Sequence, residues 1–144
     1  MRIYKLFSLT AAAIFTVVGI IFLFFPDSAL IFFNSISGYF GLPQAPLQGT
    51  GFYLILASAY MYFVTLLACL MYRYPEENIY PFLLAQAKLA SSIISIYLFL
   101  MHQPYLIYFT NFAIDGFIGI AVLCLMKIKK RFDYASENNT DLHS

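Results

Sequence analysis

Two charged residues, Lys88 and Asp115, lie inside long apolar stretches of the sequence. A charged side chain at the centre of a bilayer costs about 2.5–3.5 kcal/mol on insertion scales, so each needs a partner, a cavity or a route to the interface. Three arrangements meet this need: an ion pair that fixes helix register, a ligand or proton site, and a Lys88 side chain that reaches the membrane surface. These two residues are therefore the first candidates for function.

Other polar residues recur around this pair at helical spacing. Ser91 and Ser95 follow Lys88 by three and seven residues, and Asn111 precedes Asp115 by four. Residues at such spacing share one face of a helix, which predicts a polar seam inside a helical bundle. Hydroxyl-bearing and small residues also serve helix packing without any ligand. The predicted ligand-binding or ion-pair seam comprises Lys88, Asp115, Asn111, Ser91, Ser95, Tyr108 and Tyr62.

The short connection HQP makes the two charged segments an antiparallel hairpin. Folding that hairpin about Gln103 places Asp115 level with Ser91 and Lys88 about 4.5 Å deeper along the axis, at about 1.5 Å per residue. A lysine side chain can span that offset. Helical side chains lean toward the N-terminus of their own helix, however, which tips these two apart. The sequence therefore leaves open whether the two charges pair.

Aromatic residues suggest a second kind of chemistry. The chain has 12 tyrosines and 16 phenylalanines but no tryptophan. Several tyrosines lie deep in the apolar stretches, where each hydroxyl needs a partner and where a flat apolar ligand such as a quinone or sterol would fit. These are Tyr60, Tyr62, Tyr97 and Tyr108.

Neither a cofactor nor a reaction type follows from the motifs. The histidines, His102 and His143, are far apart in sequence, which argues against haem ligation and zinc binding. Glycine-rich phosphate loops and the GxSxG and HExxH signatures do not occur. The cofactor is unknown, and catalysis is not implied.

The elements that must position these residues are membrane-spanning helices. The chain of 144 residues is 62% hydrophobic and 10% charged, with a mean hydropathy of +0.79, whereas soluble domains are about 25% charged. Four apolar segments approach or exceed the roughly 20 residues that cross a hydrocarbon core. They are Phe7 to Phe25, Phe52 to Tyr72, Pro81 to Met101 and Tyr105 to Met126. The predicted fold is therefore an all-α, four-helix transmembrane bundle.

Lysine and arginine placement predicts the orientation. Arg2 and Lys5 precede the first segment, Arg73 lies between the second and third, and a basic cluster at 127–131 follows the fourth. By the positive-inside rule both termini are cytoplasmic, and the cluster is expected to meet anionic lipid and not nucleic acid. We expect a multi-pass protein of a bacterial inner membrane.

The remaining segments complete the expected organisation. The first outer connection, from Pro26 to Gly51, contains SALIFFNSISGYF, which predicts a short helix in the outer membrane interface. Residues 1–131 form the predicted membrane domain. Residues 132–144 are polar without an apolar period and are predicted to be a disordered cytoplasmic tail.

Three segments give the chain a resemblance to a known family. They are GFYLILASAYMY, AQAKLASS and NFAIDGFIG, within a four-span layout that covers about residues 7 to 126. In architecture this layout resembles the DoxX-like membrane proteins. The resemblance implies a four-helix fold and, as one possibility, a small subunit of a quinone-reducing membrane complex.

The leading hypothesis is a protein without enzymatic activity that uses its polar seam to bind an apolar or amphipathic small molecule, such as a quinone, sterol or lipid. The same hypothesis includes a second possibility, that the protein is a small subunit of a larger membrane complex. The alternatives are a proton-coupled or small-solute transporter acting as an oligomer, and a lipid-modifying enzyme that uses Asp115 as an acid. The expected partners are membrane lipids, a small molecule and further protein copies or subunits.

Overall fold

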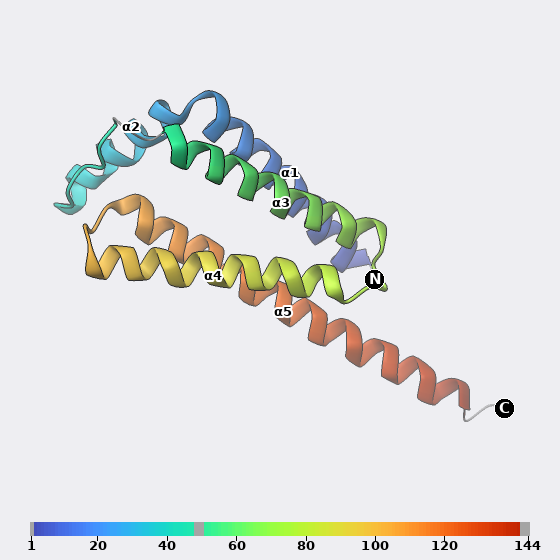
Figure 1. Ribbon diagram of the computed structural model, residues 1–144. Helices are drawn as coiled ribbons and strands as arrows, with labels where there is room; N and C mark the ends of the chain where they lie inside the picture. The colour runs from blue at the N-terminus through green and yellow to red at the C-terminus, as the bar shows by residue number, and fades with distance from the viewer. Residues whose placement is uncertain (1, 48–50, 142–144) are drawn as a thin grey trace.

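All regular structure in the part of the chain that the computed structural model describes, residues 2–47 and 51–141, is helical (Figure 1). The prediction of an all-α fold is thus confirmed for these residues. The elements in chain order are α1 (Arg2–Phe24), α2 (Pro26–Ser37), the short 3-10 helix η1 (Gly38–Phe40), α3 (Gly51–Arg73), α4 (Ile79–Met101) and α5 (Leu106–Asp141).

Four of these helices are long and apolar enough to cross a membrane. Within the described residues the candidate spans are Arg2–Phe24, Tyr53–Arg73, Ile79–Met101 and Leu106–Arg131. Each differs from its predicted segment by a few residues at the ends. The prediction of a multi-pass membrane protein with four spans is confirmed, while the side on which the termini lie stays a prediction.

The four long helices form two pairs. The most extensive contacts run between α4 and α5 and between α1 and α3, and α3 meets α4 over a smaller area (Figure 1). Short connections reverse the chain between α3 and α4, at Tyr74–Asn78, and between α4 and α5, at 102–105. The bundle therefore consists of two antiparallel helix pairs, and their interface lies where α3 packs beside α4.

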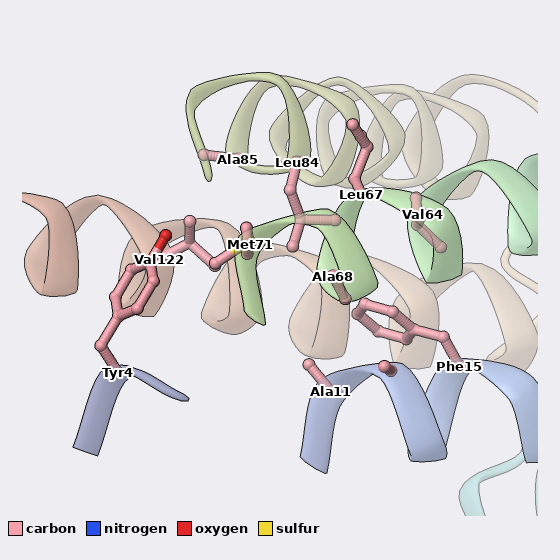
Figure 2. Packing of buried hydrophobic residues seen from close by; sticks show 11 residues of the cluster. Tyr4, Ala11, Phe15, Val64, Leu67, Ala68, Met71, Leu84, Ala85 and Val122 are labelled. Carbon is pink, nitrogen blue, oxygen red and sulfur yellow. The ribbon is translucent and has the colours of Figure 1, made fainter. Parts of the chain in front are cut away.

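The apolar core draws on all four long helices (Figure 2). Large side chains such as Phe15, Met71, Leu84 and Val122 are almost fully buried there. Most other apolar side chains face outward, as a bundle in lipid requires. The fully buried part of the molecule is therefore narrow, and any polar group inside it lies close to several helices at once.

The connection between the first and second spans contains the expected short helix, α2. Pro26 occupies the first turn, where its missing N–H costs nothing. Beyond the helix the chain folds back, because the Asn34 side chain donates to the Ala45 carbonyl oxygen and accepts from the Ala45 N–H, both at 2.8 Å. The helix is confirmed, and its place in the membrane interface stays a prediction.

The last helix runs past the predicted end of the membrane domain. Its backbone is helical from Leu106 to Asp141 and so crosses the boundary drawn at residue 131. The division into a membrane domain and a disordered tail stays a prediction.

Candidate functional site

Glycines on α5 let it approach α4 closely. A Cβ atom at Gly116 would lie 2.9 Å from Ser92 Oγ, and one at Gly119 would lie 2.8 Å from Leu89 Cγ. Such contacts are shorter than real Cβ atoms show, so a larger residue at either position would require Ser92 or Leu89 to shift. The close approach brings Lys88 of α4 and Asp115 of α5 within reach of each other.

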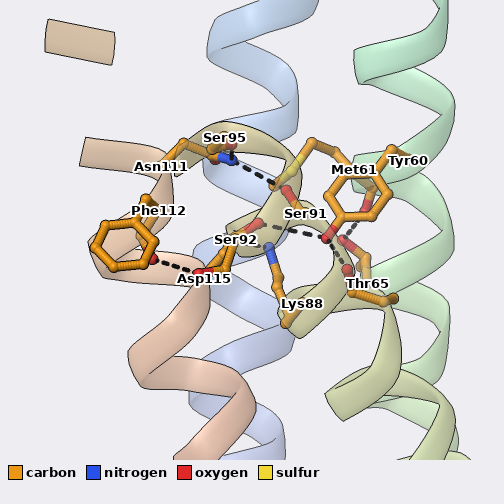
Figure 3. A network of polar contacts seen from close by, with 11 residues as sticks. Tyr60, Met61, Thr65, Lys88, Ser91, Ser92, Ser95, Asn111, Phe112 and Asp115 are labelled. Atoms are coloured by element: carbon orange, nitrogen blue, oxygen red, sulfur yellow. Dashed lines mark hydrogen bonds and ion pairs between the residues drawn. The ribbon is translucent and has the colours of Figure 1, made fainter. Parts of the chain in front are cut away.

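Lys88 and Asp115 form a buried ion pair. Lys88 Nζ lies 2.8 Å from Asp115 Oδ1, and the two side chains are 3% and 5% exposed (Figure 3). The lysine therefore turns inward and does not extend to the membrane surface. Of the arrangements that the sequence left open, pairing is confirmed, and helix direction did not prevent it because the close helices bring the two side chains together.

The ion pair is a junction of all four spans. Lys88 Nζ lies 4.5 Å from the ring centroid of Phe15 on α1 and 5.1 Å from that of Tyr60 on α3. Cations at such distances are attracted by the ring face. The Tyr60 hydroxyl in turn lies 3.4 Å from Asp115 Oδ2 and 3.2 Å from the Ala87 carbonyl oxygen. One lysine thus links the α1–α3 pair to the α4–α5 pair.

A second polar cluster lies about one turn away on the same two helices. Asn111 Nδ2 donates to Ser91 Oγ at 3.0 Å and to Ser95 Oγ at 2.7 Å (Figure 3). Ser92 Oγ donates to the Phe112 carbonyl oxygen at 2.9 Å. The predicted group of Lys88, Asp115, Asn111, Ser91 and Ser95 is therefore brought together in space.

An open groove lies beside this cluster, between α3 and α4. Its volume is about 370 Å³, within the range of roughly 300–1,000 Å³ for ligand sites. The lining residues are Tyr60, Ala87, Ala90, Ser91, Ile94 and Ser95. Three of them carry hydroxyls that hydrogen bond within the buried network. The groove thus has small and apolar walls with a few hydroxyl groups, from Tyr60 of α3 and from Ser91 and Ser95 of α4.

Of the two remaining predicted seam residues, Tyr62 lies away from this cluster, whereas Tyr108 precedes Asn111 by three residues on α5. Tyr62 is 71% exposed on the outside of α3, and Tyr108 is half-buried, with its ring 5.6 Å from that of Tyr105. The inward face of α3 carries Tyr60, Val64 and the apolar residues that follow them. Tyr62 is offset from that face, because packing of the apolar side chains sets the rotation of this helix.

Phe15 and Ser92 were missed by the sequence analysis. Phe15 shares a face of α1 with Tyr4, Ser8 and Ala11, all buried, and this period of four, three and four was a readable signal. Ser92 had no such signal. The sequence does not show which of the adjacent serines, Ser91 or Ser92, faces the neighbouring helix. Tyr60 had been singled out for its depth.

Known proteins give no further assignment for this site. Among the described residues, no group of three or more His, Cys, Asp or Glu side chains is placed to hold a metal ion. The protein-family models, the curated proteins and the solved structures contain no match to this chain. The chain is a small multi-pass membrane protein with a buried Lys88–Asp115 pair.

Proposed function

We propose that this protein binds an apolar or amphipathic small molecule, such as a quinone, sterol or lipid, in the groove between α3 and α4. The observation that carries the proposal is the groove itself, which has both apolar walls and hydroxyl groups. Pockets for small molecules combine these features, since apolar walls supply affinity and a few polar groups fix orientation.

The groove is suited to a ligand that arrives from the membrane. Ala90 and Ile94 are exposed on the outer surface of α4, in a helix long enough to span the bilayer. Their side of the groove therefore faces hydrocarbon, from which an apolar molecule enters without crossing water. Ala87 and Ala90 leave room for a flat group against the helix.

The ion pair supports the groove without lining it. Lys88 and Asp115 are buried and are not among the residues that line the groove, whereas Tyr60 both lines the groove and contacts Asp115. In this proposal Lys88 and Asp115 stabilise the interface between the two helix pairs. Ser91, Ser95 and Tyr60 meet the ligand.

A tryptophan at Ala90 tests the proposal, because its side chain would fill the groove from an exposed position. Ile93→Trp is the matched control, since Ile93 is 67% exposed on the same helix and does not line the groove. We expect native mass spectrometry from mild detergent to find a bound small molecule on the unaltered protein and on Ile93→Trp, and to find it lost from Ala90→Trp.

Equal small-molecule content in all three proteins would contradict the proposal. The same spectra report protein partners, and a subunit that co-purifies with all three would favour the other form of the hypothesis, a small subunit of a larger complex.

We also propose that the protein resembles the DoxX-like proteins, lies in a bacterial inner membrane and associates with further copies of itself. The two-pair bundle supports that resemblance in architecture.

Transport by an oligomer is the second candidate, and the buried ion pair favours it. A carboxylate paired with a lysine inside a membrane is a typical element of proton-coupled carriers. Four spans are few for alternating access, so the transporting unit would be an assembly. Purified protein in sealed vesicles should then acidify or alkalise the lumen when a pH difference is applied. The double variant Lys88→Leu, Asp115→Leu should abolish that flux.

A further inference from the structure

We infer that two copies of this protein associate through the outward face of α3, with Tyr62 of each copy at the centre of the contact. This inference rests on the self-association proposed above and names its surface. Three observations carry it: the position of the Tyr62 hydroxyl, the spacing of the exposed residues around it, and the ability of one tyrosine hydroxyl to bond to another.

The Tyr62 side chain points out of the bundle near the middle of its span. It is 71% exposed and lies nine residues after Tyr53 and eleven before Arg73, or about 14 Å and about 17 Å along the span at about 1.5 Å per residue. From there a tyrosine side chain is too short to bring its hydroxyl to either membrane surface. Among the described residues, no group hydrogen bonds to this hydroxyl. Because an unpaired hydroxyl in hydrocarbon is costly, Tyr62 needs a partner from another molecule.

The other exposed tyrosines of the described spans lie near the helix ends. Tyr53 and Tyr72 are close to the two ends of α3. Tyr97 lies four residues before the end of α4, with its ring 6.2 Å from that of His102. Tyrosines at such positions are typical of the aromatic belts at the membrane interfaces. Tyr62 lies too deep for that explanation.

The residues around Tyr62 form an exposed stripe along α3. Ile55, Ala59, Tyr62, Leu66 and Cys69 are all exposed and follow one another at intervals of four, three, four and three residues. This alternation is the heptad spacing with which one helix packs along another. Ala59 is small and lies one turn from Tyr62, so a neighbouring helix can come close there. The stripe therefore suits a further helix packed along α3.

A second copy of the chain supplies a matching helix. Two copies inserted in the same direction, and related by a two-fold axis along the membrane normal, bring identical residues together at identical depth. A tyrosine hydroxyl both donates and accepts, so Tyr62 of one copy can donate to Tyr62 of the other. The stripe from Ile55 to Cys69 carries no charge that would repel its copy. The surface is therefore self-complementary, as a two-fold contact requires.

Crosslinking between cysteines tests this surface, because Cys69 lies in the stripe and the other exposed cysteine, Cys124, lies on α5. The variants Cys124→Ser and Cys69→Ser each keep one of the two. Each full chain is reconstituted in vesicles of phosphatidylethanolamine and phosphatidylglycerol over a range of protein-to-lipid ratios. An ethylene-bridged bis-methanethiosulfonate is added, and non-reducing electrophoresis measures the crosslinked dimer.

We expect the protein that keeps Cys69 to form crosslinked dimer at protein-to-lipid ratios where the protein that keeps Cys124 stays monomeric. Adding Tyr62→Phe to Cys124→Ser removes the hydroxyl and keeps the ring. It should raise the ratio of half-maximal crosslinking about fivefold, which corresponds to one hydrogen bond of about 1 kcal/mol. Tyr97→Phe is the matched control and should leave that ratio unchanged, because Tyr97 is 55% exposed but lies near the end of α4.

The other outcomes overturn the inference in distinct ways. Crosslinking through Cys124 alone would mean that the copies meet at another face. Equal crosslinking through both cysteines, lost together on dilution in lipid, would show random collision. Crosslinking through Cys69 that Tyr62→Phe leaves unchanged would show that the hydroxyl takes no part in the contact.

Monomer alone at every ratio, with either cysteine, would overturn the proposed self-association as well. None of these results decides whether the groove binds a small molecule. Tyr60 lines the groove, and at 3.6 residues per turn its side chain and that of Tyr62 leave α3 in nearly opposite directions. The groove is tested separately by Ala90→Trp, so the two proposals can fail independently.

Discussion

Two lysines join the helix pairs of this protein, Lys88 in the middle of the bundle and Lys129 at one end. Each lysine lies near both a carboxylate and an aromatic ring. Lys88 lies 2.8 Å from Asp115, and both side chains are buried. Lys129 donates to the Pro75 carbonyl oxygen and lies 3.9 Å from Glu76 Oε2, on a glutamate that is 69% exposed.

The difference teaches that surroundings, and not the identity of the groups, set what each contact contributes. Lys129 also lies 5.9 Å from the ring of Tyr4, much as Lys88 lies above Phe15. Exposed ion pairs contribute about 0–1 kcal/mol because water and salt screen them. Removing one partner of a buried pair costs about 3–5 kcal/mol, since a charge is left without compensation. We therefore expect the two lysines to differ several-fold in their effect on stability.

The largest effect is expected for Lys88→Leu. This change leaves Asp115 buried without its cation, and we expect the free energy of unfolding to fall by about 3–5 kcal/mol. The measurement is the loss of helical circular dichroism on heating or with denaturant, in detergent micelles.

The double variant Lys88→Leu, Asp115→Leu separates pairing from packing. Replacing both members of a buried pair by apolar residues is often neutral or stabilising, so this protein should regain most of the stability lost in the single variant. A double variant as unstable as Lys88→Leu would mean that leucine packing, and not the unpaired charge, caused the loss.

The next effect concerns the close helix approach that makes the buried pair possible. In Gly119→Ala the new Cβ would meet Leu89 Cγ at 2.8 Å and the Ala85 carbonyl oxygen at 3.4 Å. We expect α5 to move away from α4 and stability to fall by about 1–3 kcal/mol, as overpacked sites do. The same unfolding measurement applies.

Two further variants test that explanation. Gly38→Ala is the control, because a Cβ there has no neighbour within 4 Å. Adding Leu89→Ala to Gly119→Ala should restore the close approach. If Gly119→Ala unfolds like the unaltered protein, the close approach is not limited by this glycine.

A smaller effect is expected for Phe15→Leu, which removes the ring nearest to Lys88. The ring lies 4.5 Å from Nζ, and cation–π contacts contribute about 0.5–2 kcal/mol, with the larger values at desolvated sites. We expect a loss of that size from the ring contact, in addition to the loss of buried volume. The change in free energy of unfolding should be measured with and without Lys88.

The background without the ion pair isolates the ring contact. In the protein that carries Lys88→Leu and Asp115→Leu, Phe15→Leu can only lose volume, so its cost should be smaller. Equal cost in both backgrounds would show that Phe15 contributes packing alone.

Much of the architecture was predictable because it depends on local composition. Runs of about 20 apolar residues specify spans, and the short HQP connection specifies a hairpin, whatever the rest of the chain does. Lys88 and Asp115 were identifiable for the same reason, since a charge within such a run is costly wherever it lies. Asn111, Ser91 and Ser95 followed from helical spacing.

What could not be predicted depends on how one helix is rotated against another. Tyr62 and Tyr60 are two residues apart on α3, and only packing against α1 and α4 decides that Tyr60 faces inward. The pairing of Lys88 with Asp115 depends on the spacing of α4 and α5, which Gly116 and Gly119 set through contacts between helices. The spacing of Phe15 with Tyr4, Ser8 and Ala11 could indicate the buried face of α1, but the contact of Phe15 with Lys88 depends on how α1 packs against α4.

The smallest effect is expected for Glu76→Gln, which removes the acidic partner of Lys129 and little else. The Lys129 side chain contacts the connection between α3 and α4 at Pro75. The other members of the basic cluster, Lys127, Lys130 and Arg131, are exposed. Because Glu76 is well exposed and 3.9 Å away, we expect the free energy of unfolding to fall by about 0–1 kcal/mol at low salt and by less at high salt. Unfolding at both salt concentrations is the measurement. A loss as large as that of Lys88→Leu, unchanged by salt, would mean that this end of the bundle excludes water as the middle does. The contrast between the two lysines would then disappear.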